Sequence, residues 1–272
     1  MSAAVFYNNE ISILADERAV DIAKNNQDVY IATRSFGNNA SSKIWKNNNL
    51  YATFQESRYQ LIIKRILMVN KDVYSLVTED SINRAITKTR LYKNTEFISY
   101  VEPPSNFNIN RTSVLGDNIY FDGNTVFVAG LLENQTDQKN TFFSWKNRQM
   151  TTYAQGQRNE IVNGWSRVFK DNNDFYFVTT TDNPILYPTP TIRVWKNNTL
   201  IYTSSPLLGG LISYGGIYLN NNKLYIAGAT QTLTADRRNY ILSTMFVDDS
   251  GIINVLSSPN NTTSFAVQIL VQ

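Results

Sequence analysis

Short apolar segments in which hydrophobic and polar residues alternate recur along the whole chain, at a period of roughly 40 to 53 residues. Each copy holds a segment around Val-Tyr or a similar aromatic pair and, about sixteen residues later, a segment around Trp-Lys-Asn. DVYIA with KIWKNNNL and DFYFV with RVWKNNTL are two of these copies. Alternation with a period of two over roughly 4 to 8 residues predicts β-strands.

Each unit of the repeat contains four strand-like segments: a leading strand, an aromatic strand, a Trp-Lys-Asn strand and a short return strand. The leading strands centre on Ile22, Ile66, Ile119, Val168, Ile217 and, at the C-terminal end, Ile269. The aromatic strands carry Tyr30, Tyr74, Phe127, Tyr176 and Tyr225 at one fixed position. The Trp-Lys-Asn position is held by Tyr7, Trp45, Tyr92, Trp145, Trp195 and Phe246.

This self-similarity, built only from strands, is typical of a radial β array. We therefore predict an all-β chain that forms one β-propeller domain over residues 1–272. The expected propeller is six-bladed, with four-stranded antiparallel blades and one incomplete blade. A five-bladed propeller with an appended hairpin is the alternative.

Asn-rich pairs stand between leading and aromatic strands and between Trp-Lys-Asn and return strands. Two-residue hairpin loops need positive φ angles, which Asn tolerates better than most residues, so these pairs predict tight turns. The other connections, such as FGNNASS and TDNPILYPTP, are long and varied. Tight turns then share one end of each blade and long loops the other. The blade boundary must lie in a long loop, after either the aromatic or the return strand.

Composition excludes several kinds of chemistry. The chain has no Cys and no His, so disulfides, thiolate chemistry, Cys/His zinc sites and Ser-His-Asp triads are absent. A formal net charge of +3 with scattered Lys and Arg gives no support for a nucleic-acid partner. No apolar run approaches the roughly 18 residues of a membrane helix, so membrane insertion is not expected. We expect no cofactor and no metal.

The N-terminal segment MSAAVFYNNEISILA lacks the basic and apolar regions of a signal peptide. An extracellular or cell-surface location is therefore expected only if an export signal was removed. A return strand missing from the last unit would leave an unpaired strand edge that a neighbour could fill. The chain is thus expected to be a monomer or one module of a larger surface assembly.

The best candidate for a ligand site is a residue that breaks the repeat. Trp165 enters a leading strand where other copies have smaller residues, with Arg167 two positions on. We predict a ligand-binding pocket at the mouth of a central channel, with no catalytic residue, formed by Trp165, Arg167, Tyr214, Tyr187 and Arg237. The alternative is that Trp165 fills a gap in the core.

Other side chains have two interpretations each. The aromatic residues of the Trp-Lys-Asn position could stack on sugars, but packing between blades is the preferred interpretation. A ring of polar residues before the leading-strand markers could bind a small ligand, or its members could pair with each other. This ring is Asp21, Arg65, Asn118, Arg167, Gly216 and Gln268. Carboxylates in long loops could form a glycosidase pair, although solvated loop carboxylates are commoner. They are Glu79, Asp80, Glu102, Asp137, Glu160, Asp182 and Asp236.

The repeat resembles that of secreted and surface β-propeller-like proteins of Bacteroidetes-type bacteria, whose units read approximately DVYVAG followed by a WKNG hairpin. The matching segments are Asp28-Val29-Tyr30, Trp45-Lys46-Asn47, Val126 to Gly130, Trp145-Lys146-Asn147, Trp195-Lys196-Asn197 and Leu224 to Gly228. The chain departs from that pattern by replacing the turn Gly. The resemblance implies a surface-exposed location and no established chemistry.

Loops held by a rigid scaffold are where binding residues concentrate. The function expected from the sequence is therefore a non-enzymatic binding propeller that recognises a glycan or protein partner through its long-loop face. The alternative is a carbohydrate-active hydrolase or lyase that uses the loop carboxylates.

Overall fold

The computed structural model describes residues 3–7, 10–14, 17–25, 28–35, 41–81, 86–135, 139–155, 168–180, 191–203, 210–220, 223–233, 240–248 and 253–256. Every regular element within these ranges is a β-strand. Within the same ranges, no helix is long and apolar enough to span a membrane. The chain divides into two compact units, residues 1–136 with 143–151 and residues 137–142 with 152–272.

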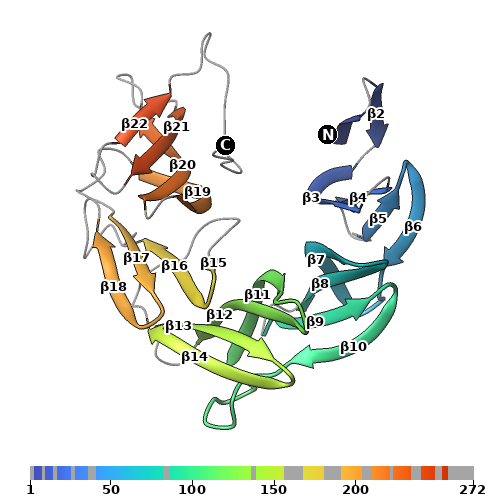
Figure 1. Ribbon diagram of the computed structural model, residues 1–272, viewed down its shortest axis with the longest axis horizontal. Coiled ribbons are helices and arrows are strands. Elements are labelled where there is room, and N and C mark those ends of the chain that lie inside the picture. The colour runs from blue at the N-terminus through green and yellow to red at the C-terminus, as the bar shows by residue number, and fades with distance from the viewer. Residues whose placement is uncertain are drawn as a thin grey trace. The chain divides into compact units, whose positions relative to one another are not determined.

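The first unit begins with a two-stranded hairpin and continues with four-stranded antiparallel sheets, here called blades (Figure 1). The hairpin is β1 (Ala3–Tyr7) and β2 (Glu10–Leu14), and the first blade is β3 (Glu17–Asn25), β4 (Asp28–Ser35), β5 (Ser42–Lys46) and β6 (Asn49–Phe54). The second blade is β7 (Tyr59–Val69), β8 (Asp72–Ser81), β9 (Lys88–Lys93) and β10 (Glu96–Val101). The third, mostly in this unit, is β11 (Thr112–Phe121), β12 (Val126–Asn134), β13 (Lys139–Lys146) and β14 (Gln149–Gln155).

The second unit contains the fourth and fifth blades. The fourth is β15 (Val168–Asp171), β16 (Asp174–Thr180), β17 (Ile192–Lys196) and β18 (Thr199–Thr203). The fifth is β19 (Gly210–Asn220), β20 (Lys223–Leu233), β21 (Tyr240–Asp248) and β22 (Ile253–Leu256). Aromatic rings form part of the core here, because Phe142 and Phe177 stack with their centroids 4.3 Å apart.

The all-β fold with four-stranded antiparallel blades is confirmed. In every blade the strands pair in the order in which they follow in the chain, from leading strand to return strand. The blade boundary therefore lies in the loop after the return strand, which settles the choice that the sequence left open. Two arrangements were predicted, six blades with one incomplete and five blades with an appended hairpin. Both contain the five four-stranded sheets and the hairpin found among the described residues. The number of blades in the propeller and the single domain over 1–272 stay predictions.

The tight turns are confirmed by their backbone angles. Among the described residues, positive φ angles occur at the turns between Trp-Lys-Asn and return strands, at Asn47, Asn48, Asn94, Asn147, Arg148 and Asn197. They also occur between leading and aromatic strands, at Asn70, Asn172 and Gly123. A positive φ angle is energetically unfavourable for a residue with a Cβ atom, and the penalty is smaller for Asn than for most residues. The Asn pairs are therefore turn residues.

A β-bulge recurs at one position of the leading strands. The pairing register shifts between Ala19 and Asp21, between Ile63 and Arg65, and between Gly116 and Asn118. The leading strands β3, β7 and β11 contact one another in turn, as inner strands of a propeller do. Asp21 accepts a hydrogen bond from the Ile66 amide at 2.8 Å, which joins β3 to β7 beside the bulge.

The polar ring around these bulges is partly described. Burial raises the pKa of Asp21, while the nearby Arg65 guanidinium and two backbone amides oppose the rise. Asn118 donates to the Tyr120 hydroxyl at 3.0 Å. These contacts support the interpretation that ring members satisfy each other or neighbouring groups within the scaffold.

Two residues of the Trp-Lys-Asn position, Tyr92 and Trp145, pack between blades, as predicted, whereas Trp45 packs against Val29 and Ile31 of its own blade. Tyr92 and Trp145 are 8% and 4% exposed. Tyr92 lies in a cluster with Tyr30, Ile44 and Phe54 of the first blade. Trp145 of the third blade packs with residues of the second blade, among them Leu76, Leu91 and Val101. Burying large aromatic side chains between sheets is a main source of stability in such arrays.

The Lys and Asn of this motif form a polar staple with an Asp that starts the aromatic strand. In the second blade the side chain of Asn94 accepts a hydrogen bond from the Val73 amide at 3.0 Å and donates one to Asp72 at 3.0 Å. Lys93 forms an ion pair with Asp72 at 2.8 Å and lies over the Tyr74 ring. The staple therefore ties the end of β9 to the beginning of β8.

The same staple recurs in two other blades. The first blade uses Asp28, Lys46 and Asn47, and the fourth uses Asp174, Lys196 and Asn197. The third blade keeps the ion pair between Lys146 and Asp122, while Asp122 accepts hydrogen bonds from the amides of Asn124 and Thr125. Turn geometry, which the sequence predicts for the Asn pairs, therefore explains these residues only in part.

Replacing Asn94 should separate the two contributions of this residue. Asn94→Gly keeps the positive φ angle but removes the side-chain hydrogen bonds, so the free energy of unfolding should fall by about 1 to 2 kcal/mol. Asn94→Ala removes the same bonds and also forces a poor backbone angle, which should cost about 1 kcal/mol more. Urea denaturation of both variants measures this, and an Ala variant as stable as the Gly variant would contradict it.

The staple also predicts acid sensitivity. Hydrogen bonds from Lys93 and Asn94 hold the pKa of Asp72 below its usual value, so the folded protein binds this proton less tightly than the unfolded chain. Its stabilising effect should be complete above the unfolded pKa of about 4 and lost as pH falls through the lowered pKa. Melting temperatures of wild type and Asp72→Asn should differ at neutral pH and converge in acid. A pH-independent difference would disprove this origin.

Candidate functional site

Charged side chains gather at the long-loop end of the first two blades. This is the end at which aromatic strands finish and Trp-Lys-Asn strands begin. Three groups of contacts occur there, each built from several strands. Their members are Glu17 with Thr33, Lys43 and Trp45; Arg90 with Glu56, Glu79, Tyr92 and Tyr100; and Arg18 with Arg34, Gln60 and Asp80.

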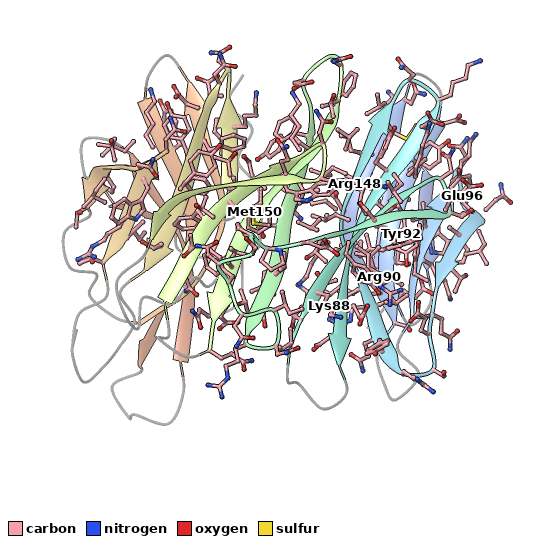
Figure 2. All side chains as sticks on the ribbon, turned by 90° about the horizontal axis from the view of Figure 1, so that it is seen from below. Lys88, Arg90, Tyr92, Glu96, Arg148 and Met150 are labelled. Carbon is pink, nitrogen blue, oxygen red and sulfur yellow. The ribbon has the colours of Figure 1, made fainter. Side chains whose placement is uncertain are left out.

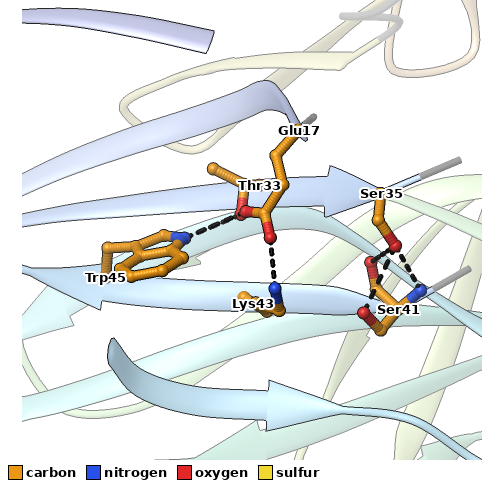
Figure 3. A network of polar contacts seen from close by, with 6 residues as sticks. All are labelled: Glu17, Thr33, Ser35, Ser41, Lys43 and Trp45. Carbon is orange, nitrogen blue, oxygen red and sulfur yellow. Dashed lines mark hydrogen bonds and ion pairs between the residues drawn. The ribbon is translucent and has the colours of Figure 1, made fainter. Parts of the chain in front are cut away.

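The first group surrounds the buried carboxylate of Glu17 at the start of β3 (Figure 3). Lys43 and Thr33 donate to it, and Trp45 donates its indole N–H at 3.1 Å. Burial raises the pKa of Glu17, but these three donors together outweigh burial and lower it. A carboxylate held in its charged form by three donors makes a poor general acid. Its contacts instead tie the leading strand of the first blade to the next two strands.

The second group surrounds the buried guanidinium of Arg90 in the middle of β9 (Figure 2). Arg90 Nε donates to Glu79 at 2.7 Å, and its Nη2 lies 2.5 Å from the same carboxylate. The two Nη atoms also contact both oxygens of Glu56, and Nη1 donates to the Tyr92 hydroxyl at 3.2 Å. Tyr100 donates to Glu79 at 3.3 Å.

Four of these contacts are hydrogen bonds from the guanidinium, one from Nε, two from Nη1 and one from Nη2, and the approach of Nη2 to Glu79 is an ion pair. Burial disfavours the charge of Arg90, but hydrogen bonds from it to Glu56, Tyr92 and Glu79 prevail and raise its pKa well above the usual range. Glu56 belongs to the loop between the first and second blades. The Arg90 group therefore holds that loop against the second blade.

Repeat position explains why these two groups look alike. Lys43 and Arg90 each stand two residues before the aromatic residue of the Trp-Lys-Asn position, and Arg193 stands there in the fourth blade. The indole of Trp195 donates to Thr179 at 3.3 Å, as that of Trp45 donates to Thr33 at 3.0 Å. These groups were not predicted from the sequence. The cation that recurs two residues before the aromatic residue of the Trp-Lys-Asn position could have indicated them. Its acidic partners, however, lie on different strands in different blades.

The third group contains an arginine pair, Arg18 and Arg34, at directly paired positions of β3 and β4. Both belong to the innermost two strands, and Arg34 is half-buried while Arg18 is exposed. Arg34 Nη2 donates to Gln60 of the second blade at 3.5 Å. Gln60 is paired with Asp80 in the second blade. Burial lowers the pKa of Arg34, Asp80 raises it, and the like charge of Arg18 lowers it.

Four residues of the site predicted from the sequence, Trp165, Arg167, Tyr187 and Arg237, lie outside the described residues. The fifth, Tyr214, is placed only by its backbone, which pairs with Gly228 in the fifth blade. That site stays a prediction. Among the described residues, no group of three or more acidic side chains is arranged to hold a metal ion.

Of the seven loop carboxylates, three are described. Glu79 is engaged by Arg90 and Tyr100, and Glu102 is exposed beyond the return strand β10. Asp80 lies at the end of β8, half-buried and near Arg34. Of the three described carboxylates, Asp80 is therefore the one that lies on an inner strand and is not held by the Arg90 group. The other four are Asp137, Glu160, Asp182 and Asp236, outside the described residues.

No family model and no curated protein matches the chain. Solved structures of similar fold include a Trypanosoma rangeli sialidase in complex with sialic acid, with a TM-score of 0.53 at 8% identity over 94% of this chain and 50% of the sialidase. A Penicillium chrysogenum α-L-arabinanase has a TM-score of 0.48 at 13% identity over 77% of this chain and 69% of its own. A Phanerochaete chrysosporium exo-β-1,3-galactanase has a TM-score of 0.46 at 11% identity over 91% and 66%.

The sialidase match agrees with the propeller fold and corrects two predictions. The chain was expected to be a non-enzymatic binding propeller and no enzyme, whereas the matched structure with a TM-score above 0.5 is a sialidase, which is an enzyme. The physical reason for the error is that long loops on a rigid scaffold serve binding and catalysis equally well. The asymmetry between short turns and long loops therefore could not separate the two functions.

The Arg90 group predicts a specific stability pattern. Arg90→Met leaves the carboxylate of Glu79 buried without its cation, and the free energy of unfolding should fall by about 3 to 5 kcal/mol. Adding Glu79→Gln removes the buried charge while keeping an acceptor for Tyr100, so the double variant should regain part of this loss. Denaturant unfolding of both variants measures the recovery. A double variant no more stable than Arg90→Met would show that Arg90 does not stabilise the fold by compensating the buried charge of Glu79.

Proposed function

We propose that the chain is a carbohydrate-active hydrolase or lyase whose active site lies at the long-loop end of its blades. The observation that carries the proposal is the half-buried carboxylate of Asp80 beside Arg34, at the inner edge of that end. A carboxylate there can take or give a proton at a bound sugar. The adjacent guanidinium can stabilise negative charge that develops during the reaction.

The fold shared with the sialidase supports the glycan part of the proposal. The chemistry agrees with the residue inventory, because acid–base catalysis by carboxylates needs neither Cys nor His. A hydrolase needs a second carboxylate about 5 to 10 Å from the first. The sequence predicts Asp137, Glu160, Asp182 and Asp236 in long loops, and the substitutions below test each of them for that role. A lyase needs a base that removes a proton from the sugar, a cation that stabilises the negative charge that develops, and an acid that protonates the leaving oxygen.

The scaffold suits this role because its buried charges are already balanced. Glu17 and Glu79 each accept three or more contacts from cations and hydrogen-bond donors, so they hold strands and loops in place. Asp80 is thereby placed on a rigid strand end rather than on a free loop. Catalytic groups on rigid elements keep their geometry when substrate binds.

Turnover on a glycan panel tests the proposal. The panel contains arabinan, xylan, β-1,3-galactan, sialylated glycoconjugates and uronate polysaccharides, and the readouts are new reducing ends and unsaturated uronate absorbance. Asp80→Asn should lower kcat by about a hundredfold to ten-thousandfold, the usual contribution of a general acid or base. Amide substitution of the four other loop carboxylates should identify a partner if the enzyme is a hydrolase.

Glu96→Gln is the matched control, because Glu96 is an exposed carboxylate at the tight-turn end of β10 (Figure 2). It should keep wild-type activity. Absence of any product from the whole panel at high protein concentration would overturn the proposal. Full activity of Asp80→Asn would remove Asp80 from the site.

A further inference from the structure

The third blade places the carboxylate that pairs with its Trp-Lys-Asn lysine differently from the first, second and fourth blades. In those three blades the Asp starts the aromatic strand, and a residue with a branched or aromatic side chain follows it in the strand. The three pairs are Asp28–Val29, Asp72–Val73 and Asp174–Phe175. In the third blade the carboxylate belongs to Asp122, which lies before the aromatic strand and is followed by Gly123. This is the one Asp-Gly step in the sequence.

The backbone amide that follows each Asp differs in the same way. The amides of Val29, Val73 and Phe175 donate to the Asn side chain of the Trp-Lys-Asn motif, at 2.9, 3.0 and 2.9 Å. The Gly123 amide forms no hydrogen bond with another described residue. Gly123 has a φ angle of 93°, and a Cβ atom added to it would meet nothing within 4 Å. At Asp122, therefore, the following amide is not engaged and the backbone has space around it.

An Asp followed by Gly can undergo an internal condensation. The Gly nitrogen attacks the side-chain Cγ atom of Asp, a C–N bond forms, and the amide proton and the carboxyl OH leave as water. Water then opens the five-membered imide at one of its two carbonyl groups. Breaking the new C–N bond restores aspartate, whereas breaking the original peptide bond gives isoaspartate, in which the main chain runs through Cβ and Cγ. A side chain on the following residue hinders the attack, and glycine has none.

The contacts of Asp122 oppose this reaction without burying the residue. Lys146 pairs with one carboxylate oxygen, and the amides of Asn124 and Thr125 donate to the other at 3.2 and 2.9 Å. These contacts, that of Lys146 first, hold the pKa of Asp122 well below its usual range, and an ionised carboxylate is a poor electrophile. The side chains of Lys146 and Asp122 are 46% and 26% exposed, so water can compete for this ion pair.

We infer that Asp122–Gly123 is a site of isoaspartate formation and that Lys146 slows the reaction for as long as the ion pair is closed. The inference is independent of the proposed catalytic function. Isoaspartate adds one carbon atom to the main chain between β11 and β12 and moves the carboxylate away from its place beside Lys146. The modification therefore loosens the tight turn of the third blade.

Peptide mapping of the aged protein tests the inference. Wild type, Lys146→Met and Lys93→Met are kept in mildly acidic buffer, digested, and analysed with an isoaspartate-specific methyltransferase and by fragmentation mass spectrometry. Lys93→Met is the matched control, because Lys93 forms the equivalent ion pair with Asp72. Isoaspartate should form at Asp122, severalfold faster in Lys146→Met than in wild type. In Lys93→Met the rate at Asp122 should equal that of wild type, and Asp72 should stay unmodified.

Asp122→Asn separates the geometry of the turn from the ionisation of the carboxylate. Its amide cannot ionise in this way and loses ammonia, so the folded variant should convert to aspartate and isoaspartate with a gain of negative charge. Conversion in urea but not in the folded state would overturn the inference, because the folded turn then keeps the Gly123 nitrogen from Cγ. Two further results overturn it: no isoaspartate at Asp122 in either wild type or Lys146→Met, or equal rates in the two proteins.

Discussion

The first, second and fourth blades each depend on the polar staple that ties the Trp-Lys-Asn strand to the beginning of the aromatic strand. A slip of one residue between two strands would turn every side chain to the other face. The staple opposes such a slip, because Asn94 bonds to both the Val73 amide and Asp72. With the register fixed, Tyr92 lies opposite Ser75 and turns into the core between blades. A few hydrogen bonds thus fix the strand register in each of these three blades.

The strands, turns and aromatic cores could be predicted because their signals are local. Alternation marks a strand within a few residues, and an Asn pair at a turn carries its own backbone preference. The polar groups could not be predicted in the same way. Arg90 contacts Glu79 from the neighbouring strand and Glu56 from the loop before the blade, and only the folded register brings them together. The boundary between blades was ambiguous for a similar reason, since both long connections look alike in sequence.

Function was harder to predict than fold because one scaffold supports many chemistries. At 8% identity, the likeness to the sialidase is visible in the path of the chain and not in its residues. The predicted loop carboxylates nonetheless included Asp80, whose inner position emerged only from the pairing of β7 with β8. The arginine pair escaped prediction because Arg18 and Arg34 are sixteen positions apart and become neighbours only through the β3–β4 register.

A repeating scaffold supplies its own reference for separating structural charges from functional ones. Lys43 and Arg90 share a repeat position with Arg193, and the first two neutralise buried carboxylates, so structure accounts for them. The arginine pair has no such counterpart, since Ile62 with Thr78 and Leu115 with Leu131 fill the equivalent positions. A strand pair that bears like charges where its relatives bear none departs from the consistency expected of a scaffold. Such departures mark places where contacts particular to one blade, here that of Arg34 with Gln60 of the second blade, take over from the repeating pattern.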